Sequence, residues 1–297
     1  MSEMSAQGRK IFFLNPPYSI KMEIIPKLQK YEYEVYTIDS YRDTKNLLRK
    51  NPNSILFINL DSQMQTPAWF NFVRSFDRED ALATTLISIL SERIKEADKE
   101  VFKKFTTLAG DIIDYSEGTE RTYAAILNIL ETNDAKGRRQ YVRATVDHDN
   151  DASLFWNHGS KMHLLKLLDI SSVGMAVKVP PALESQIIAK NFLLSDATMR
   201  LGTKQVVVEA VIYGVKQTPA GTIWILLLLP QTPASIKDEI RAYVSKTLEN
   251  QLIVTINAER KDEQDYSLLN YYNLATKTKS KTKTSMSLFS KIPGSNV

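Results

Sequence analysis

The chain has 297 residues, 43% of them hydrophobic, which is enough apolar material for two folded domains and excludes a globally disordered protein. It contains no cysteine, so disulfides, thiol catalysis and cysteine-ligated metals are excluded. The net charge of +4 comes from the C-terminal end, because no acid follows Asp265 and the chain without the five lysines after Thr276 carries −1. A nucleic-acid-binding fold is therefore not indicated, and we expect no specific nucleic-acid partner.

Neither a secretion signal nor a membrane span is expected. The first ten residues, MSEMSAQGRK, are polar and lead into no apolar segment of the kind that a signal peptide has. The longest strongly apolar run, IWILLLL at 223–229, is far too short to cross a bilayer and reads as a buried strand. We therefore expect a cytoplasmic protein without a transmembrane segment.

Residues 9–133 alternate short apolar runs with amphipathic segments. The runs are rich in β-branched or aromatic residues and have the length of strands: KIFFLNP, YEVYTID, SILFINL, TTLISIL and DIIDYS. The segments that follow each run have apolar residues at helical spacing, as in TERTYAAILNIL. Five strand–helix units in succession predict an α/β domain with a five-stranded parallel sheet covered by helices on both faces.

This alternation resembles the flavodoxin-like receiver domain of two-component signalling. The resemblance implies a phosphate-accepting aspartate after the third strand, and Asp61 in INLDSQM matches that position. It also implies a pair of magnesium-binding acids after the first strand, where this chain has Asn15, and a lysine after the fifth strand, where it has DIIDYSEG. Without the acids no metal would offset the charge of an incoming phosphoryl group. We interpret residues 9–133 as a degenerate receiver-like domain, in which Asp61 is a strand-end acid.

The pattern changes after residue 137. Seven strand-like runs, broken by Gly, Pro, Asn and Asp, predict an antiparallel β-barrel: RQYVRATVD, ASLFWNHG, KMHLLKLLDIS, GMAVKVP, NFLLSD, KQVVVEAVIYGVKQ and TIWILLLLP. A helix is predicted to follow in residues 232–252, and we place this second domain at 137–257. Residues 276–297 are rich in Lys, Ser and Thr and are expected to form a disordered tail.

Three arginines lie at the start of this second domain, in KGRRQYVRATV. Arg139 and Arg143 are four residues apart, so on an extended chain they point the same way, and Arg138 points the other way. A guanidinium presents a planar fork of donors that fits a phosphate or the O6/N7 edge of guanine. Arginine pairs at this spacing arise by chance about once in a chain of this size, so the pair alone is also compatible with a solvated basic linker.

A second motif, D-x-S-x-x-G, makes the arginines more informative. It consists of Asp169, Ser171 and Gly174 and follows the apolar run LLKLL. A carboxylate at a strand end can accept hydrogen bonds from the N1 and N2 donors of guanine, and a serine both donates and accepts. A glycine permits a sharp turn or a close backbone approach. Chance matches to this pattern are expected in fewer than roughly a tenth of chains of this length.

Together, the R-x-x-x-R and D-x-S-x-x-G motifs resemble those of the PilZ domain, a bacterial receptor for cyclic di-GMP, and this chain matches both without departure. The resemblance covers about 137–257. It implies a PilZ-type barrel that binds cyclic di-GMP and signals to a protein partner, without catalysis, metal or cofactor. An arginine at the position of Arg138 accompanies two stacked ligands in that family. The implied ligand-binding residues are Arg138, Arg139, Arg143, Asp169, Ser171 and Gly174.

Two other functions are alternatives: a protein–protein adaptor whose barrel no longer binds nucleotide, and a phosphorelay that uses Asp61. A third, hydrolysis of the dinucleotide, is disfavoured because the sequence lacks a metal-binding acid cluster. We assign structural or surface roles to His148, His158 and His163, and barrel packing to Trp156.

Overall fold

The computed structural model describes residues 8–146, 152–184 and 190–277. These residues divide into two compact units. The sheet unit comprises residues 8–25, 35–137 and 255–277, and the barrel unit comprises residues 26–34 and 138–254 within the described ranges. Residues 26–34 thus group with the barrel, and the segment that follows the last long helix groups with the sheet. The domain bounds of 9–133 and 137–257 stay a prediction.

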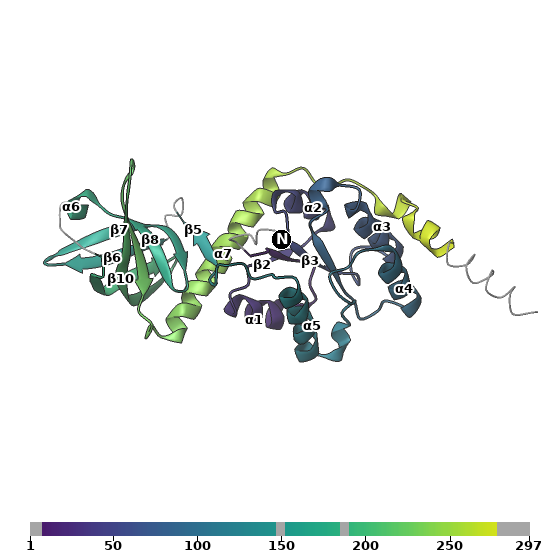
Figure 1. Ribbon diagram of the computed structural model, residues 1–297, viewed down its shortest axis with the longest axis horizontal. Coiled ribbons are helices and arrows are strands. Elements are labelled where there is room, and N and C mark those ends of the chain that lie inside the picture. The colour runs from purple at the N-terminus through teal and green to yellow at the C-terminus, as the bar shows by residue number, and fades with distance from the viewer. Residues whose placement is uncertain (1–7, 147–151, 185–189, 278–297) are drawn as a thin grey trace, which may run out of the picture. The chain divides into compact units, whose positions relative to one another are not determined.

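The sheet unit is built on four parallel strands in the order β2-β1-β3-β4. They are β1 Ile11–Leu14, β2 Val35–Ile38, β3 Ile55–Asn59 and β4 Leu86–Leu90. Every residue of β1 and β3 is buried, as expected for central strands covered on both faces. The helices are η1 Ile20–Ile24, α2 Tyr41–Lys50, α3 Thr66–Phe76, η2 Asp80–Leu82, α4 Glu96–Phe105, η3 Tyr115–Glu117 and α5 Thr119–Thr132. Figure 1 shows α2 and α3 on one face of the sheet and α5 on the other.

The prediction of a fifth parallel strand in this sheet is wrong. After β4 only two isolated bridges extend the sheet, Ile87 with Leu108 and Leu90 with Ile113. Between the bridges the chain leaves the edge of β4 and approaches α5, where a Cβ on Gly110 would come within 2.7 Å of the Ile129 side chain. A Cβ at this position would force the Ile129 side chain to shift, so glycine suits the close approach, and residues 110–112 form no bridge with β4.

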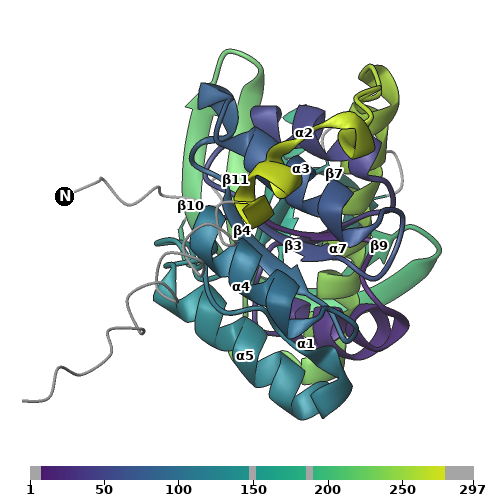
Figure 2. The same ribbon diagram turned by 90° about the vertical axis from the view of Figure 1, so that its right-hand side faces the viewer.

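The segment after residue 258 completes the sheet unit by packing on α3, and Figure 2 shows it in yellow beside α2 and α3. Asn71 of α3 donates through Nδ2 to the carbonyls of Tyr266 (2.8 Å) and Leu269 (2.7 Å), and its Oδ1 accepts from the Tyr272 amide (3.0 Å). Tyr266, in the short helix η4 Tyr266–Leu268, is 2% exposed. Burial, followed by its hydrogen bond to Asp262, raises the pKa of Tyr266, so it stays a neutral donor.

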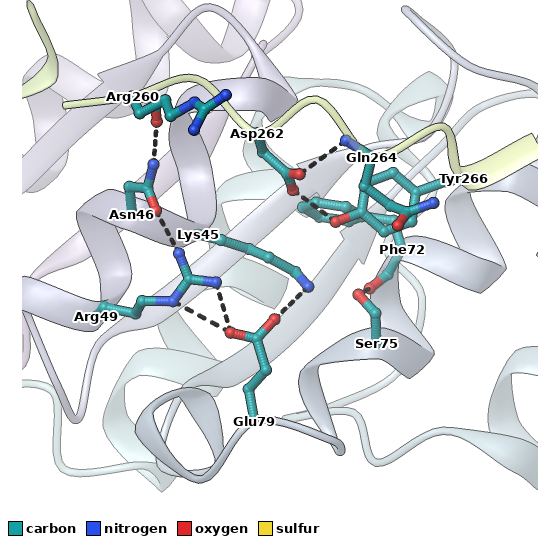
Figure 3. Close-up of polar contacts among 10 residues, drawn as sticks. All are labelled: Lys45, Asn46, Arg49, Phe72, Ser75, Glu79, Arg260, Asp262, Gln264 and Tyr266. Carbon is teal, nitrogen blue, oxygen red and sulfur yellow. Dashed lines mark hydrogen bonds and ion pairs between the residues drawn. The ribbon is translucent and has the colours of Figure 1, made fainter.

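A second group of contacts on this face is centred on Glu79 (Figure 3). Its carboxylate accepts from Lys45 (2.7 Å), which is 4% exposed, and from Arg49 (2.6 Å). Burial alone would raise the pKa of Glu79, but the hydrogen bonds from the two cations outweigh burial and lower it. Asn46 joins this group to the C-terminal segment through the carbonyl of Arg260. The buried lysine charge is thus compensated.

The barrel unit is an antiparallel sheet in the order β5-β7-β6-β9-β10-β11-β8, closed by pairing of β7 with β8. Its strands are β5 Arg143–Thr145, β6 Ala152–His158, β7 Lys161–Ser171, β8 Gly174–Lys178, β9 Leu193–Leu201, β10 Lys204–Thr218 and β11 Gly221–Leu228. Side chains alternate between the core and solvent along β11, as the period of a strand requires. The prediction of an antiparallel barrel is confirmed.

Helices flank the barrel strands. They are α1 Ile25–Lys30, most of which belongs to the barrel unit, α6 Pro181–Glu184 and α7 Ala234–Ala258, which follows the last strand as predicted. Ile240 and Val244 of α7 pack into the barrel core. The core also holds Trp156, 3% exposed and stacked on His158, which confirms its packing role. His148 lies outside the described residues.

No helix in the described part of the chain is long and apolar enough to cross a membrane. Residues 271–277 are helical, so the first two residues of the predicted disordered tail belong to a helix. The remainder of that tail, residues 278–297, lies outside the described residues.

Candidate ligand-binding site

The two motifs found in the sequence meet at one end of the barrel. Arg143 is the first residue of β5, which pairs antiparallel with the end of β7, so that Arg143 lies opposite Ser171 and Thr145 lies opposite Asp169. The end of β7 also pairs with the start of β8, where Ser171 lies opposite Gly174. Four of the six predicted site residues therefore lie on three adjacent strand ends.

Arg143 and Asp169 form an ion pair at this edge. Nη1 of Arg143 lies 3.2 Å from Oδ1 of Asp169, and the side chains are 41% and 25% exposed. The pair is close, yet Oδ1 of Asp169 is buried and receives no hydrogen bond from the residues that the structure describes. Among the described residues, the ion pair with Arg143 is thus the only polar contact that Oδ1 makes, and both side chains stay partly exposed.

Ser171 and Gly174 form the β7–β8 hairpin. The Ser171 hydroxyl donates to the carbonyl of Gly174 (3.1 Å), and Ser171 is 1% exposed. A Cβ on Gly174 would lie 2.4 Å from the carbonyl oxygen of Leu226, so the glycine permits close packing against β11. In this structure both residues shape the turn, and their contacts with a ligand stay predictions.

Arg138 and Arg139 lie on irregular chain just before β5, and both are exposed. Among the described residues, neither side chain has a hydrogen bond or an ion pair. An exposed guanidinium without a partner retains all five donors for an anion. The two arginines are therefore available to bind an anion next to Arg143.

Four residues in contact with one another beside the two motifs were not predicted as site residues from the sequence: Glu32, Val142, Ser172 and Arg241. Glu32 accepts through Oε1 from the Ser172 hydroxyl (2.6 Å) and from Nε of Arg241 (2.7 Å), and through Oε2 from the Val142 amide (3.0 Å). Glu32 is more than a hundred residues from the motifs in the sequence and Arg241 is some seventy residues beyond them, so no local pattern indicates the cluster.

The receiver-like position Asp61 has a different environment in the sheet unit. Its Oδ1 accepts from the Ser91 hydroxyl (2.6 Å), and its Oδ2 accepts from the Glu92 amide (2.8 Å) and the Tyr115 hydroxyl (2.7 Å). Burial, then the hydrogen bond to Asp61, raises the pKa of Tyr115, which therefore stays a donor. Both carboxylate oxygens are engaged in a strand-end network.

We expect Asp61 not to accept a phosphoryl group. Mass spectrometry after incubation with acetyl phosphate should show no aspartyl phosphate, because both oxygens are engaged and Asn15 replaces a metal-binding acid. Asp61→Asn should lower the free energy of unfolding by about 1–2 kcal/mol through lost charge-assisted hydrogen bonds. Phosphorylation of the wild type that Asp61→Asn abolishes would instead support a phosphorelay role.

In the described part of the chain, no group of three or more His, Asp or Glu side chains is arranged to hold a metal ion. The site at the barrel end consists of guanidinium groups, one carboxylate and a tight hairpin. Such groups bind an anion and a hydrogen-bonding base by charge and geometry, and none of them is arranged with a partner as a nucleophile and its base.

No protein-family model matches the sequence, and no curated protein matches it. Solved structures to which the chain is similar include the PilZ domain of YcgR with c-di-GMP from Escherichia coli, with 12% identity, a TM-score of 0.34, and coverage of 41% of this chain and 99% of that one. The motility inhibitor MotI/DgrA of Bacillus subtilis has 21% identity and a TM-score of 0.32, and the match covers 40% of this chain and 55% of that one. The MrkH–c-di-GMP complex of K. pneumonia has 16% identity and a TM-score of 0.30, and the match covers 41% of this chain and 56% of that one.

The match thus spans about half the length of MotI and MrkH.

Proposed function

We propose that the protein is a cytoplasmic PilZ-type receptor for cyclic di-GMP that signals to a protein partner by a conformational change. The observation that carries the proposal is the pairing of β5 with the end of β7, which brings Arg143 of one motif within 3.2 Å of Asp169 of the other. These residues are 26 positions apart in the sequence. The ligand-binding residues would be Arg138, Arg139, Arg143, Asp169, Ser171 and Gly174.

The chemistry of the ligand fits the charges at this end of the barrel. Cyclic di-GMP carries two phosphates and two guanines, and the exposed forks of Arg138 and Arg139 can meet phosphates or the O6/N7 edges. The Asp169 side chain is 25% exposed, so its carboxylate can accept from the N1 and N2 donors of guanine. Adenine lacks that pair of donors, so guanine should be preferred.

Calorimetric titration of the full-length chain with cyclic di-GMP, and with cyclic di-AMP as the control, tests the proposal. We expect saturable binding of cyclic di-GMP and at least about tenfold weaker binding of cyclic di-AMP, the loss expected for one unpaired buried acceptor. The alternative is a protein–protein adaptor whose barrel binds no nucleotide. No heat with either dinucleotide would favour the adaptor, and equal affinity would contradict the role of Asp169 in reading the base.

The same titration should give two ligands per chain. Arg139 and Arg143 can already engage the two phosphates of one ligand, so the exposed Arg138, on the irregular chain before β5, is left for a second ligand. Two stacked ligands would bring four phosphates together, and a third guanidinium offsets that repulsion. We expect Arg138→Leu to bind one ligand. A ratio of one for the wild type would mean that Arg138 is a solvated linker charge.

A further inference from the structure

We infer that Glu32 is a positioning residue that holds the two ligand-binding segments together before the ligand arrives. This inference rests on the proposed function. Glu32 follows α1 and belongs to the barrel unit, with a side chain that is 10% exposed. Its carboxylate accepts from one donor beside each motif, the Val142 amide and the Ser172 hydroxyl, and from Arg241 of α7.

The contact with Val142 fixes the arginine segment. Val142 directly precedes Arg143, and its side chain packs against the barrel core. Its amide lies just outside the β5–β7 ladder, and Glu32 Oε2 is the acceptor at 3.0 Å. Without this anchor, the chain before Arg143 has more freedom, and a ligand that orders it has to offset the entropy that is lost.

The contact with Ser172 fixes the second segment. Ser172 lies in the two-residue turn between Ser171 and Gly174 and is 1% exposed, so its hydroxyl cannot rely on water. Glu32 Oε1 accepts from it at 2.6 Å. One carboxylate therefore spans both motifs and fixes the separation of Arg143 from the hairpin.

Arg241 reduces the repulsion that the Glu32 carboxylate would exert on an anionic ligand nearby. Its Nε lies 2.7 Å from Glu32 Oε1, and its Nη1 lies 2.7 Å from Asp238. The ion pair offsets the negative charge of Glu32, which would otherwise oppose phosphate binding. The backbone of Glu32 also has a φ of +61°, a region that non-glycine residues adopt at a cost, so other contacts hold it there.

The test compares three variants. Glu32→Ala removes all three contacts, and we expect cyclic di-GMP to bind roughly tenfold more weakly because the segment before Arg143 must be ordered on binding. Asp238→Ala is the matched control, because it removes an equal charge from the same arginine without touching either motif; we expect a change of less than about twofold. In Glu32→Gln the amide oxygen can still accept from Val142 and the NH2 group can donate to the Ser172 hydroxyl, but the contact with Arg241, which is a donor, is lost; we expect affinity to lie within about threefold of the wild type.

Amide hydrogen exchange of residues 138–146 in the ligand-free chain provides a second readout. We expect exchange at Val142 to be faster in Glu32→Ala and unchanged in Asp238→Ala. If the wild type binds no cyclic di-GMP, the proposed function fails, and the exchange result still decides whether Glu32 positions the segment. Unchanged exchange at Val142 in Glu32→Ala, or Glu32→Gln binding as weakly as Glu32→Ala, would overturn the inference.

Discussion

We expect Arg143→Ala to weaken cyclic di-GMP binding by at least about 2 kcal/mol, which is roughly thirtyfold. The substitution removes a charge-assisted fork from the point where the two motifs meet, 3.2 Å from Asp169. It also leaves the buried oxygen of Asp169 without its nearest cation, which costs more than the loss of an exposed contact. Calorimetry on the full-length chain measures the change.

Two further variants separate the guanidinium fork from general charge. Arg143→Lys keeps the charge but cannot bind two atoms of one phosphate or base edge, so we expect an intermediate loss of about tenfold. Lys178→Ala removes a cation from the end of β8 that lies away from the hairpin, and should change affinity by less than about twofold. The fold should survive, because the Arg143 side chain is 41% exposed. Unchanged affinity in Arg143→Ala would remove Arg143 from the site.

The strands could be predicted where the sequence contains a continuous apolar run or a regular alternation of apolar and polar residues. The runs that became β1 and β3 are fully buried, and continuous apolar runs are typical of central parallel strands. The fifth run, DIIDYS, contains two aspartates and a serine and buries only Ile113 at the sheet edge, just after the chain passes close to α5 at Gly110. The contact between Gly110 and Ile129 joins residues 19 positions apart in the sequence, so it could not be predicted from a local pattern.

The site was only partly predictable for a similar reason. Arg143 and Asp169 could be paired because both belong to motifs whose spacing carries information. Ser171 illustrates the limit, because its motif indicates a ligand contact, whereas its hydroxyl donates to Gly174 within the turn. Glu32 could not be found at all, since an isolated glutamate after a short helix has no distinguishing neighbours. Its three contacts arise from the folded barrel unit alone.

The end of α7 and the course of the chain after it could not be predicted from the sequence either. Residues 232–252 have a helical sequence, and α7 continues to Ala258. Beyond it, Asn71 satisfies two carbonyls and one amide of the C-terminal segment, so that irregular chain is held on α3. Side-chain to backbone contacts of this kind replace the hydrogen bonds that regular structure would supply, and they leave no period in the sequence.

The largest effect on stability is expected from Gly174→Ala. A methyl group at Gly174 would lie 2.4 Å from the carbonyl oxygen of Leu226 and 3.0 Å from Cδ2 of Leu227. The first of these atoms is backbone in β11, which pairs with β8 in the closed barrel, so it cannot move without disturbing the ladder. We expect a loss of about 3 kcal/mol in the free energy of unfolding of the barrel, at the upper end of the cost of overpacking.

Hydrogen exchange of the β8 and β11 amides measures this loss without interference from the sheet unit. Gly214→Ala in β10 is the matched control, because its methyl group would meet only the Ile225 side chain, at 3.7 Å. We expect that variant to change the opening free energy by less than about 1 kcal/mol. Gly174→Ala should also weaken cyclic di-GMP binding, since the strain falls on the β7–β8 pairing next to Asp169. If both glycine variants were equally stable, close packing against Leu226 would not be the reason for the glycine, and a requirement of the ligand itself would be the better explanation.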